Sequence, residues 1–435
     1  MPSLARSTVY NAVGSAAMLG SGFLTTIIAA RMLGPQAVGL VAFATLIVSL
    51  ALAVIDLGLP GAMTRYVPEL KTRGEGKADA VAAAILIPYA AFTVACSIGL
   101  YIALRLSDIN VGSEKTLVCG LVAAAVAVQG LAAFHYGVLK GQQDFVTFAV
   151  LAVLSGTLQV AIAVVGALAY GVPGVLAAPV IAFALPAAAA LWRMRKAQSL
   201  GGLTLMRRLL MFSSQTWLIY IFTTVSWSRV EIYFLRARWG DHDAGLFAAG
   251  LNLANLALQG PMFLTGALLP YLVAKHTEDP NALAPAFRQT LTYFAMVVFP
   301  LTLGIAAIAP LLLPLIYGPG FREAIPAATI LIAGNAAMAV IAIVQQFAFA
   351  TERVRALLLW SATTAALTLV SGLTLTQTYG VLGAAWGRAG LLAGSAVFML
   401  ILARRWGWPI PYAALSLIAG LSALAALGLH LAVRG

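Results

Sequence analysis

Runs of about twenty apolar residues recur along the whole chain of 435 residues, and a helix of that length spans the hydrocarbon core of a bilayer. Thirteen such runs occur, at 7–32, 37–60, 80–104, 116–139, 146–170, 172–192, 209–235, 244–273, 289–317, 324–350, 355–377, 381–402 and 411–433. Charged residues make up only 9% of the chain, whereas soluble domains carry about 25%. The sequence therefore predicts an all-α integral membrane protein with about 13 transmembrane helices.

Lys and Arg are distributed unequally between the two sets of loops. If the N-terminus is cytoplasmic, 17 of the 26 fall in inner loops, 7 fall in outer loops and the other two lie inside apolar runs. Basic residues favour the cytoplasmic side. Together with thirteen runs, this asymmetry predicts a cytoplasmic N-terminus and an outer C-terminus. The first run, 7–32, is longer than the apolar region of a signal peptide, so we expect it to remain as a membrane helix.

The net charge of +12 comes from basic residues that stand singly or in short clusters between the apolar runs. This pattern is typical of topology signals and of attraction to anionic lipid, and it does not indicate a nucleic-acid surface.

Two sequence motifs occur twice, at nearly the same separation. The segment 170–178 (YGVPGVLAA) is echoed at 379–385 (YGVLGAA), and 33–40 is echoed at 239–246. Two matches at offsets of 206–209 residues predict two six-helix lobes in the same orientation, related by a pseudo-two-fold axis along the membrane normal. The predicted organisation is an N-terminal lobe at 1–192, a basic cytoplasmic linker at 193–208, a C-terminal lobe at 209–403 and an extra helix within 404–435.

Motifs of soluble catalytic chemistry are absent from the sequence. It holds no P-loop, no HExxH and no GxSxG, and its two cysteines and four histidines lack metal-ligand spacing. Loops of about twenty residues at most leave no room for a catalytic domain. We expect a transporter, with no catalytic residues, no cofactor and no metal.

Ionisable residues inside apolar runs are the best indicators of function, because each costs several kcal/mol if it faces lipid. Arg229 and Glu231 lie in the run 209–235, about 200° apart if that run is one helix. Arg388, beside the small-residue face Gly383, Gly387, Gly390 and Gly394, is either a cavity cation or a residue that snorkels outward. Asp56 is expected either to pair locally with Arg65 or to cap a helix end.

Polar stripes occur on the first helix of each predicted lobe. Tyr220, Thr224, Trp227 and Glu231 would share one face of 209–235, and Asn11 begins a small-polar stripe on 7–32. Each stripe suits either a wall that contacts sugar or polar contacts between helices. Arg31 adds a cation at the outer end of 7–32, and Asn252 in 244–273 offers neutral hydrogen bonding.

Three short motifs carry a family resemblance. They are Leu33-Gly34-Pro35 with Gly39, Asp56-Leu57-Gly58-Leu59 with Arg65-Tyr66, and Ala244-Gly245-Leu246-Phe247. Over roughly residues 1–405 the chain resembles the polysaccharide-type (Wzx-like) flippases of the multidrug/oligosaccharidyl-lipid/polysaccharide exporter superfamily. That family usually has twelve or fourteen helices, so the thirteenth apolar run departs from its pattern.

The resemblance implies a function and a set of partners. Such proteins move undecaprenyl-diphosphate-linked sugars from the inner to the outer leaflet of the bacterial cytoplasmic membrane. A proton or sodium gradient and a polysaccharide polymerase would be compatible partners. The candidate cavity residues are Arg31, Arg65, Arg229, Glu231, Arg388, Asn11, Tyr220, Trp227 and Asn252.

Three other functions remain as alternatives. A lipid II flippase would share the fold, although such proteins typically line their cavity with arginines near the first helix. A drug or cation antiporter would need a titratable carboxylate, for which Glu231 and Asp56 are the candidates. A membrane glycosyl polymerase would need a large outer loop, and the sequence has none.

Overall fold

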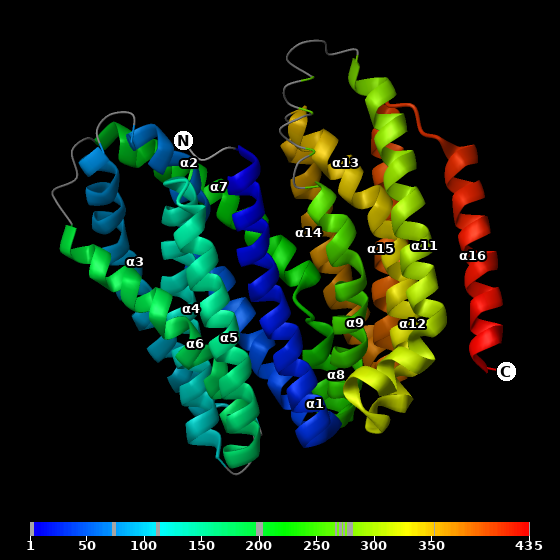
Figure 1. Ribbon diagram of the computed structural model, residues 1–435, viewed down its shortest axis with the longest axis horizontal. Coiled ribbons are helices and arrows are strands. Elements are labelled where there is room, and N and C mark those ends of the chain that lie inside the picture. Colours follow the sequence, from blue (N-terminus) through cyan, green and yellow to red (C-terminus); the bar gives the residue numbers. More distant parts are fainter. Residues whose placement is uncertain are drawn as a thin grey trace. The chain divides into compact units, whose positions relative to one another are not determined.

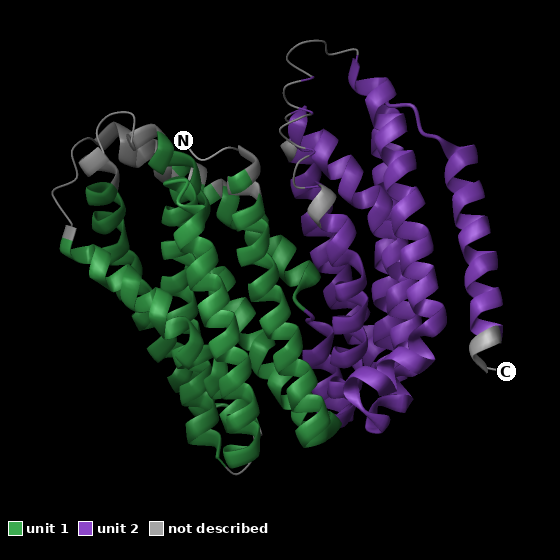
Figure 2. Ribbon diagram, viewed as in Figure 1, with its two compact units in different colours: residues 1–228 green, residues 229–435 purple. Residues whose placement is uncertain are grey.

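The computed structural model describes residues 4–71, 75–109, 114–196, 203–265, 268, 272, 275, 282–351 and 353–434. These residues are almost all helical and contain no strand. Contacts divide the chain into two compact units, 1–228 and 229–435 (Figure 2). The predicted linker at 193–208, of which 197–202 lie outside the described residues, stays a prediction.

The described residues of unit 1 form seven α-helices and one short 3-10 helix (Figure 1). In chain order they are α1 (Leu4–Asp56), α2 (Leu59–Lys71), α3 (Glu75–Leu106), α4 (Lys115–Gly141), α5 (Phe145–Tyr170), α6 (Val172–Arg193), η1 (Met194–Lys196) and α7 (Leu203–Trp227). Helix α5 packs against α1 and α6, and α4 packs against α2, α3 and α6.

The described part of unit 2 follows from α8 (Figure 1). Its elements are α8 (Glu231–Trp239), α9 (Asp241–Thr265), α11 (Leu283–Tyr317), η3 (Pro319–Ala324), α12 (Ile325–Gly334), η4 (Asn335–Ala337), α13 (Met338–Ala350), α14 (Val354–Ser371), the π-helical turn η5 (Gly372–Thr376), α15 (Gln377–Arg405) and α16 (Tyr412–Arg434). Helices α9 and α15 both pack on α12, and α16 packs on α11.

The all-α membrane architecture predicted from the apolar runs is confirmed. Nine helical stretches of the described residues are long and apolar enough to cross a membrane. Two of them, Val9–Asp56 and Arg355–Arg405, are interrupted at Gly34 and Gly380 and so each contain two predicted runs. The runs 209–235 and 244–273 correspond to α7 with α8 and to α9. The chain is therefore a multi-pass membrane protein.

Backbone geometry repeats in the two halves, as the sequence motifs do. Gly34 has φ 81° and ψ −176°, and its counterpart Gly240 has φ 90° and ψ −178°. Gly171 has φ 61° and ψ −131°, and its counterpart Gly380 has φ 59° and ψ −137°. Glycine adopts these left-handed conformations readily because it lacks Cβ. The repeated sequences therefore form the same turns.

Close backbone approach fixes the helix pairs of unit 1. A Cβ added at Gly174 would lie 2.0 Å from the carbonyl oxygen of Gly166, and one at Gly137 would lie 2.4 Å from that of Pro60. Only glycine permits such contact between α5 and α6 and between α4 and α2. Small residues commonly mediate helix packing in membranes, where apolar surface gains nothing by avoiding lipid.

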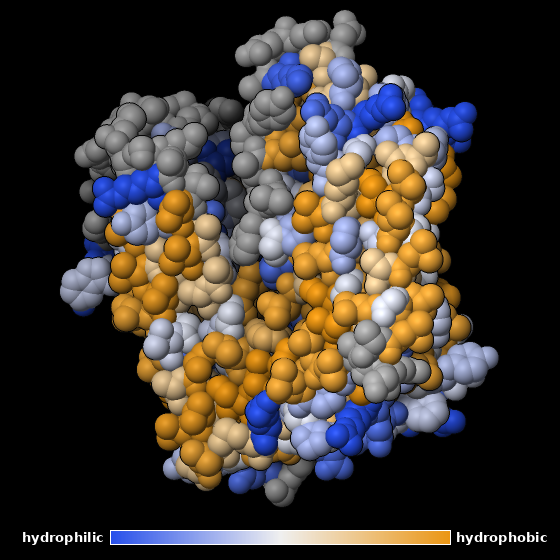
Figure 3. Space-filling model, turned by 45° about the vertical axis from the view of Figure 1, so that its right-hand side comes forward, coloured by the Kyte–Doolittle hydropathy of each residue, from blue (hydrophilic) through white to orange (hydrophobic). Residues whose placement is uncertain are grey.

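Large apolar side chains cover the outside of the helices. On the face seen in Figure 3, hydrophobic residues extend along the middle of the helices and hydrophilic residues gather near their ends. Helix α16 has an especially apolar outer surface, and its exposed leucines include Leu417, Leu421, Leu424 and Leu427. Such a surface is stable only in hydrocarbon.

We expect reporter fusions to confirm the predicted orientation. A fusion at Ser199, which lies outside the described residues, should report a cytoplasmic position because five basic residues surround it in 193–208. A fusion after Arg434 should report an external position. An internal reading at Arg434 would show that one of the predicted runs does not cross the membrane.

Candidate functional site

The predicted helix 209–235 is broken at Ser228-Arg229-Val230, which corrects the expectation of one continuous helix. Arg229 has a φ of 69°, a left-handed conformation that costs a residue with Cβ about 1–2 kcal/mol. Glu231 therefore begins α8 and does not continue the face of Tyr220 and Trp227 on α7. The 200° separation of Arg229 and Glu231 does not apply either.

This break is specific to the second half of the chain. Arg229 precedes Gly240 by the same eleven residues as Phe23 precedes Gly34, yet α1 passes through Phe23 without interruption. The internal repeat therefore does not require the break. Backbone strain of this kind concentrates at functional sites, where the surrounding structure maintains it.

A buried ion pair joins α8 to α15. Nη1 of Arg388 donates to Oε1 of Glu231 at 3.0 Å, and the two side chains are 7% and 3% exposed. The alternative in which Arg388 snorkels outward is therefore wrong. The second carboxylate oxygen of Glu231, Oε2, is buried and has no hydrogen-bond partner among the described residues.

Two further side chains complete this group, which we name the arginine cluster: Arg229, Glu231, Tyr317 and Arg388. The guanidinium of Arg229 interacts electrostatically with the other three groups. Tyr317, at the end of α11, is fully buried. The four residues of the cluster include two guanidiniums and one carboxylate, so the cluster carries a net positive formal charge.

Close packing around α15 holds the arginine cluster in place. A Cβ at Gly387 would lie 2.0 Å from Oγ of Ser371, and one at Gly383 would lie 2.0 Å from the carbonyl oxygen of Leu375. Gly390 and Gly394 have no neighbour within 4 Å of that position, so the predicted small-residue face packs closely only in its first half. Arg388 follows directly on the tightest contact.

The other end of α8 is also fixed. Nε1 of Trp239 donates to the carbonyl oxygen of Thr376 at 3.2 Å, and Arg236 forms an ion pair with Asp241. A Cβ at Gly372, in η5, would collide with the ring of Phe234 at 2.2 Å. Helix α8 is therefore attached to η5 and α15 along its length, which positions Glu231 toward Arg388.

The remaining predicted site residues lie apart from this cluster or in the other unit. Arg31 is exposed, and exposed Arg65 stacks on the ring of Tyr66 at 5.8 Å. Asn11, Tyr220 and Trp227 are partly or fully exposed in unit 1. Asn252 in unit 2 is buried, and its Nδ2 has no hydrogen-bond partner in the described part of the chain.

Asp56 caps the break between α1 and α2. Its Oδ1 accepts a hydrogen bond of 2.9 Å from the N–H of Gly58. Of the two interpretations of Asp56, the helix-end cap is confirmed. The described contacts of Asp56 include no tie to Arg65.

A polar network that the sequence did not indicate lies at the end of unit 1 that is predicted to be cytoplasmic. Asp79 of α3 accepts hydrogen bonds from Arg193 at 2.5 Å and from Gln142 at 2.6 Å. These residues belong to separate runs, and nothing in their local sequence signals the contact. The network connects α3 and α6 to the turn after α4.

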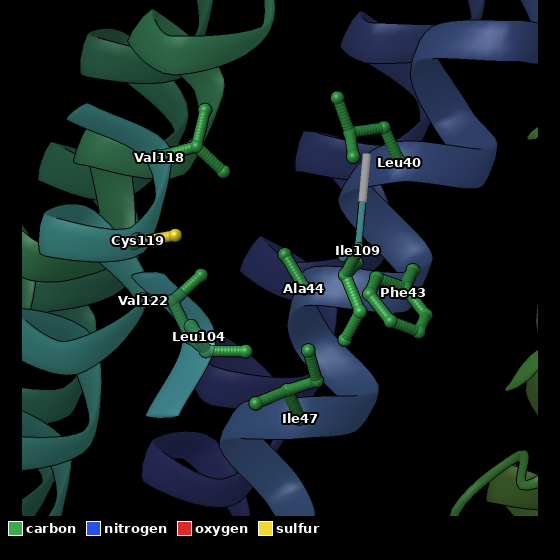
Figure 4. Close-up of a pocket in the computed structure, with 9 residues that line it drawn as sticks. All are labelled: Leu40, Phe43, Ala44, Ile47, Leu104, Ile109, Val118, Cys119 and Val122. Carbon is green, nitrogen blue, oxygen red and sulfur yellow. The ribbon is translucent and has the colours of Figure 1, made fainter. Parts of the chain in front are cut away.

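A small apolar pocket lies in unit 1 (Figure 4). It is lined by Leu40, Phe43, Ala44, Ile47, Leu104, Ile109, Val118, Cys119 and Val122. Apart from the thiol of Cys119, these side chains offer nothing to a polar ligand. The lining of the pocket is therefore apolar and offers no site for sugar or phosphate.

The described residues contain no group of three His, Cys, Asp or Glu side chains that could hold a metal ion. The arginine cluster has a different chemistry. Guanidinium groups present forked N–H donors that match phosphate and carboxylate oxygens. What the cluster can do is hold an anion.

Comparison with solved structures identifies the fold. A lipid II flippase, MurJ, in an inward closed conformation superposes with a TM-score of 0.77 over 98% of this chain and 93% of that chain, at 12% identity. An inward-facing multidrug resistance transporter of the MATE family gives a TM-score of 0.70 over 94% and 98%, at 15% identity. A MOP superfamily transporter from Pyrococcus furiosus gives 0.60 over 98% and 95%, at 16% identity.

Sequence comparison supplies the family. No curated protein matches the chain by sequence. A family model described as polysaccharide biosynthesis protein matches residues 4–276, which is more than half of the chain. The chain therefore belongs to the family of polysaccharide biosynthesis proteins and has the fold of the MOP superfamily transporters.

Proposed function

We propose that this protein is a flippase that moves a polyprenyl-diphosphate-linked oligosaccharide from the inner to the outer leaflet for export of a cell-surface polysaccharide. The observation that carries the proposal is the net positive charge of the arginine cluster, in which Glu231, Tyr317 and Arg388 are buried. A diphosphate cannot cross hydrocarbon unaided, because an unpaired charge at the bilayer centre is costly. A cation held inside the protein offsets that cost.

The arginine cluster is suited to reversible binding of a phosphate. The Arg388–Glu231 pair is already neutral, so the charge of Arg229 is the one available to a phosphate. The lipid-facing helices impose no barrier to a prenyl chain, which needs no water. The polar head is therefore the part of the substrate that the protein must accommodate.

The relatives support the same chemistry. The family is named for polysaccharide biosynthesis, and MurJ is a lipid II flippase. From the charge distribution and the family resemblance, we place the protein in the bacterial cytoplasmic membrane with a cytoplasmic N-terminus. A polysaccharide polymerase on the outer side would take the product.

One alternative has specific support. The likeness to MurJ, with the higher TM-score of 0.77, favours lipid II itself as the cargo. The drug or cation antiporter alternative is less well supported at Glu231, because that carboxylate is occupied by Arg388. Both alternatives are separated from the proposal by the choice of cargo in a transport assay.

Arg229→Gln is expected to slow transport at least tenfold. Glutamine removes the charge but keeps hydrogen-bonding capacity, and a charge-assisted hydrogen bond contributes about 1.5–3 kcal/mol, or about a tenfold change or more. The measurement is flipping of a fluorescent polyprenyl-diphosphate glycan in vesicles that contain the purified protein. Arg322→Gln, an exposed arginine of the same unit, is the matched control and should flip at the wild-type rate.

Three cargoes decide between the functions in the same vesicles. Transport of the oligosaccharide-linked lipid but not of lipid II supports the proposal. Equal or faster transport of lipid II supports that alternative, and transport of a cationic dye alone supports the antiporter. A normal rate in Arg229→Gln would remove the arginine cluster from the substrate path.

A further inference from the structure

Glu231 keeps one carboxylate oxygen for which the described residues supply no donor. Its Oε1 accepts the hydrogen bond from Nη1 of Arg388 at 3.0 Å, whereas its Oε2 is buried and has no hydrogen-bond partner in the described part of the chain. The side chain is only 3% exposed, so bulk water does not reach it. A buried charged acceptor without a donor is costly, so Oε2 is suited to a donor that comes from outside the protein.

The first turn of α8 does not serve as that donor. At the start of a helix, free N–H groups often donate to a nearby carboxylate. Here the N–H of Ile232 donates to the carbonyl oxygen of Arg229 at 2.9 Å. The N–H of Tyr233 donates to the carbonyl oxygen of Val230 at 3.0 Å. Both groups are therefore engaged, and the free oxygen of Glu231 does not cap the helix.

The internal repeat does not require an ion pair at this position. Counted from the nearest repeated motif, Glu231 corresponds to Thr25 of the first half. Counted in the same way, Arg388 corresponds to Pro179. Both counterparts are neutral, yet each lies in a helix that forms without such a pair. The ion pair is therefore a feature of the second half alone, as is the break at Arg229.

Irregular backbone lies on both sides of the ion pair. Before Glu231, Arg229 has its left-handed φ of 69°. Beside Arg388, Gly387 lies against Ser371, which directly precedes the π-helical turn η5. Single π-helical turns are rare and often occur at functional sites, where backbone strain also concentrates. Both features favour a binding role for the surroundings of the pair.

A lipid diphosphate matches only part of this group. Its oxygens are negatively charged acceptors, so they suit the guanidinium of Arg229 and are repelled by Oε2 of Glu231. The sugar joined to the diphosphate does have donors. A hydroxyl group, or the N–H of an acetamido group, is attached to the carbon beside the anomeric carbon that bears the phosphate. Arg229 and Glu231 are two residues apart and interact electrostatically, so a ligand with an anion next to a donor matches both.

We propose that Oε2 of Glu231 accepts a hydrogen bond from the first sugar of the lipid-linked glycan, while Arg229 binds the adjoining diphosphate. The contact selects a sugar that carries a donor, O–H or N–H, at the carbon next to the anomeric carbon. It rests on the proposed flippase function, because it assigns another part of the same substrate to the arginine cluster. Such a site rejects an analogue that lacks the donor, since the buried acceptor is then left unpaired.

Three short-chain prenyl-diphosphate sugars test the contact through their affinity for the detergent-purified protein, measured by calorimetric titration. They carry N-acetylglucosamine, glucose or 2-deoxyglucose, which offer an N–H, an O–H and no donor at that carbon. We expect the wild type to bind one of the donor sugars at least about tenfold more tightly than the 2-deoxy sugar, because a hydrogen bond to a charged group contributes that much. The same prenyl diphosphate without a sugar measures the anion site alone.

Glu231→Gln tests the residue itself. The amide oxygen of glutamine still accepts from Arg388, but its NH2 group presents a donor where Oε2 presented an acceptor. We expect the variant to lose the preference for the donor sugars. It should bind the bare prenyl diphosphate at least as tightly as the wild type does, because a negative charge is removed. Glu323→Gln, at an exposed glutamate of the same unit, is the matched control and should keep the preference.

The outcomes separate the sugar contact from the flippase function. If the wild type binds the donor sugars no more tightly than the 2-deoxy sugar, water satisfies Oε2 and the contact is refuted, while the anion site stands. If Glu231→Gln keeps the preference, the donor meets another residue and the contact is refuted as well. If the wild type binds none of these lipids, the bare diphosphate included, the flippase proposal fails and the contact fails with it. The ligand comparison on the wild type can overturn the contact even if Glu231→Gln does not fold.

Discussion

Replacing Arg388 by alanine is expected to destabilise the protein by about 3–5 kcal/mol, the range seen when one partner of a buried ion pair is removed. The reason is the environment of Glu231, which is 2% exposed and already has one carboxylate oxygen without a hydrogen bond. Without Arg388, the hydrogen bond to the other oxygen is lost as well. The measurement is the melting temperature of the detergent-purified protein, followed by the fraction that stays monodisperse.

Two further variants isolate the cause. The double variant Glu231→Leu with Arg388→Leu removes both charges, so it should melt much closer to the wild type than Arg388→Ala does. Arg322→Ala changes an exposed arginine of the same unit and should stay within about 0.5 kcal/mol of the wild type. If Arg388→Ala melts like Arg322→Ala, the ion pair is not the buried contact described here.

The double variant also separates stability from transport. In the proposed function, the diphosphate binds Arg229, and the Arg388–Glu231 pair holds Arg229 in position. A stable double variant with slow flipping would show that the ion pair positions Arg229. A stable double variant that flips normally would limit the pair to holding α8 against α15.

The membrane helices were predictable because lipid imposes a simple rule on the sequence. Every backbone polar group must be satisfied within its segment, so a long apolar run has to be a helix. The break at Ser228-Arg229-Val230 was not predictable on those grounds, since it contains no Gly or Pro. Its left-handed residue is maintained by the packing of α8 on η5 and α15, which depends on residues far along the chain.

The residues of the candidate site could be predicted from the sequence, but the contacts between them could not. The cost of a charge in hydrocarbon singles out Arg229, Glu231 and Arg388 from the sequence alone. Glu231 and Arg388 are 157 residues apart, and only the fold brings them together. Tyr317 gave no such signal, because a tyrosine at a helix end is common near a membrane surface.

Gly58→Ala is expected to destabilise unit 1 by about 2–5 kcal/mol. A Cβ at Gly58 would lie 2.2 Å from the carbonyl oxygen of Ser213, and overpacking of this kind costs about 1–3 kcal/mol. The φ of 69° adds about 1–2 kcal/mol for a residue that carries Cβ. Melting temperature and the yield of monodisperse protein are the measurements, and both should fall.

Gly407→Ala is the matched control for the backbone term, because Gly407 has a similar φ of 79° and no atom within 4 Å of an added Cβ. It should show only the smaller cost. The excess in Gly58→Ala measures how tightly α7 packs on the junction of α1 and α2. Equal melting of the two variants would mean that α7 does not pack closely on the junction of α1 and α2.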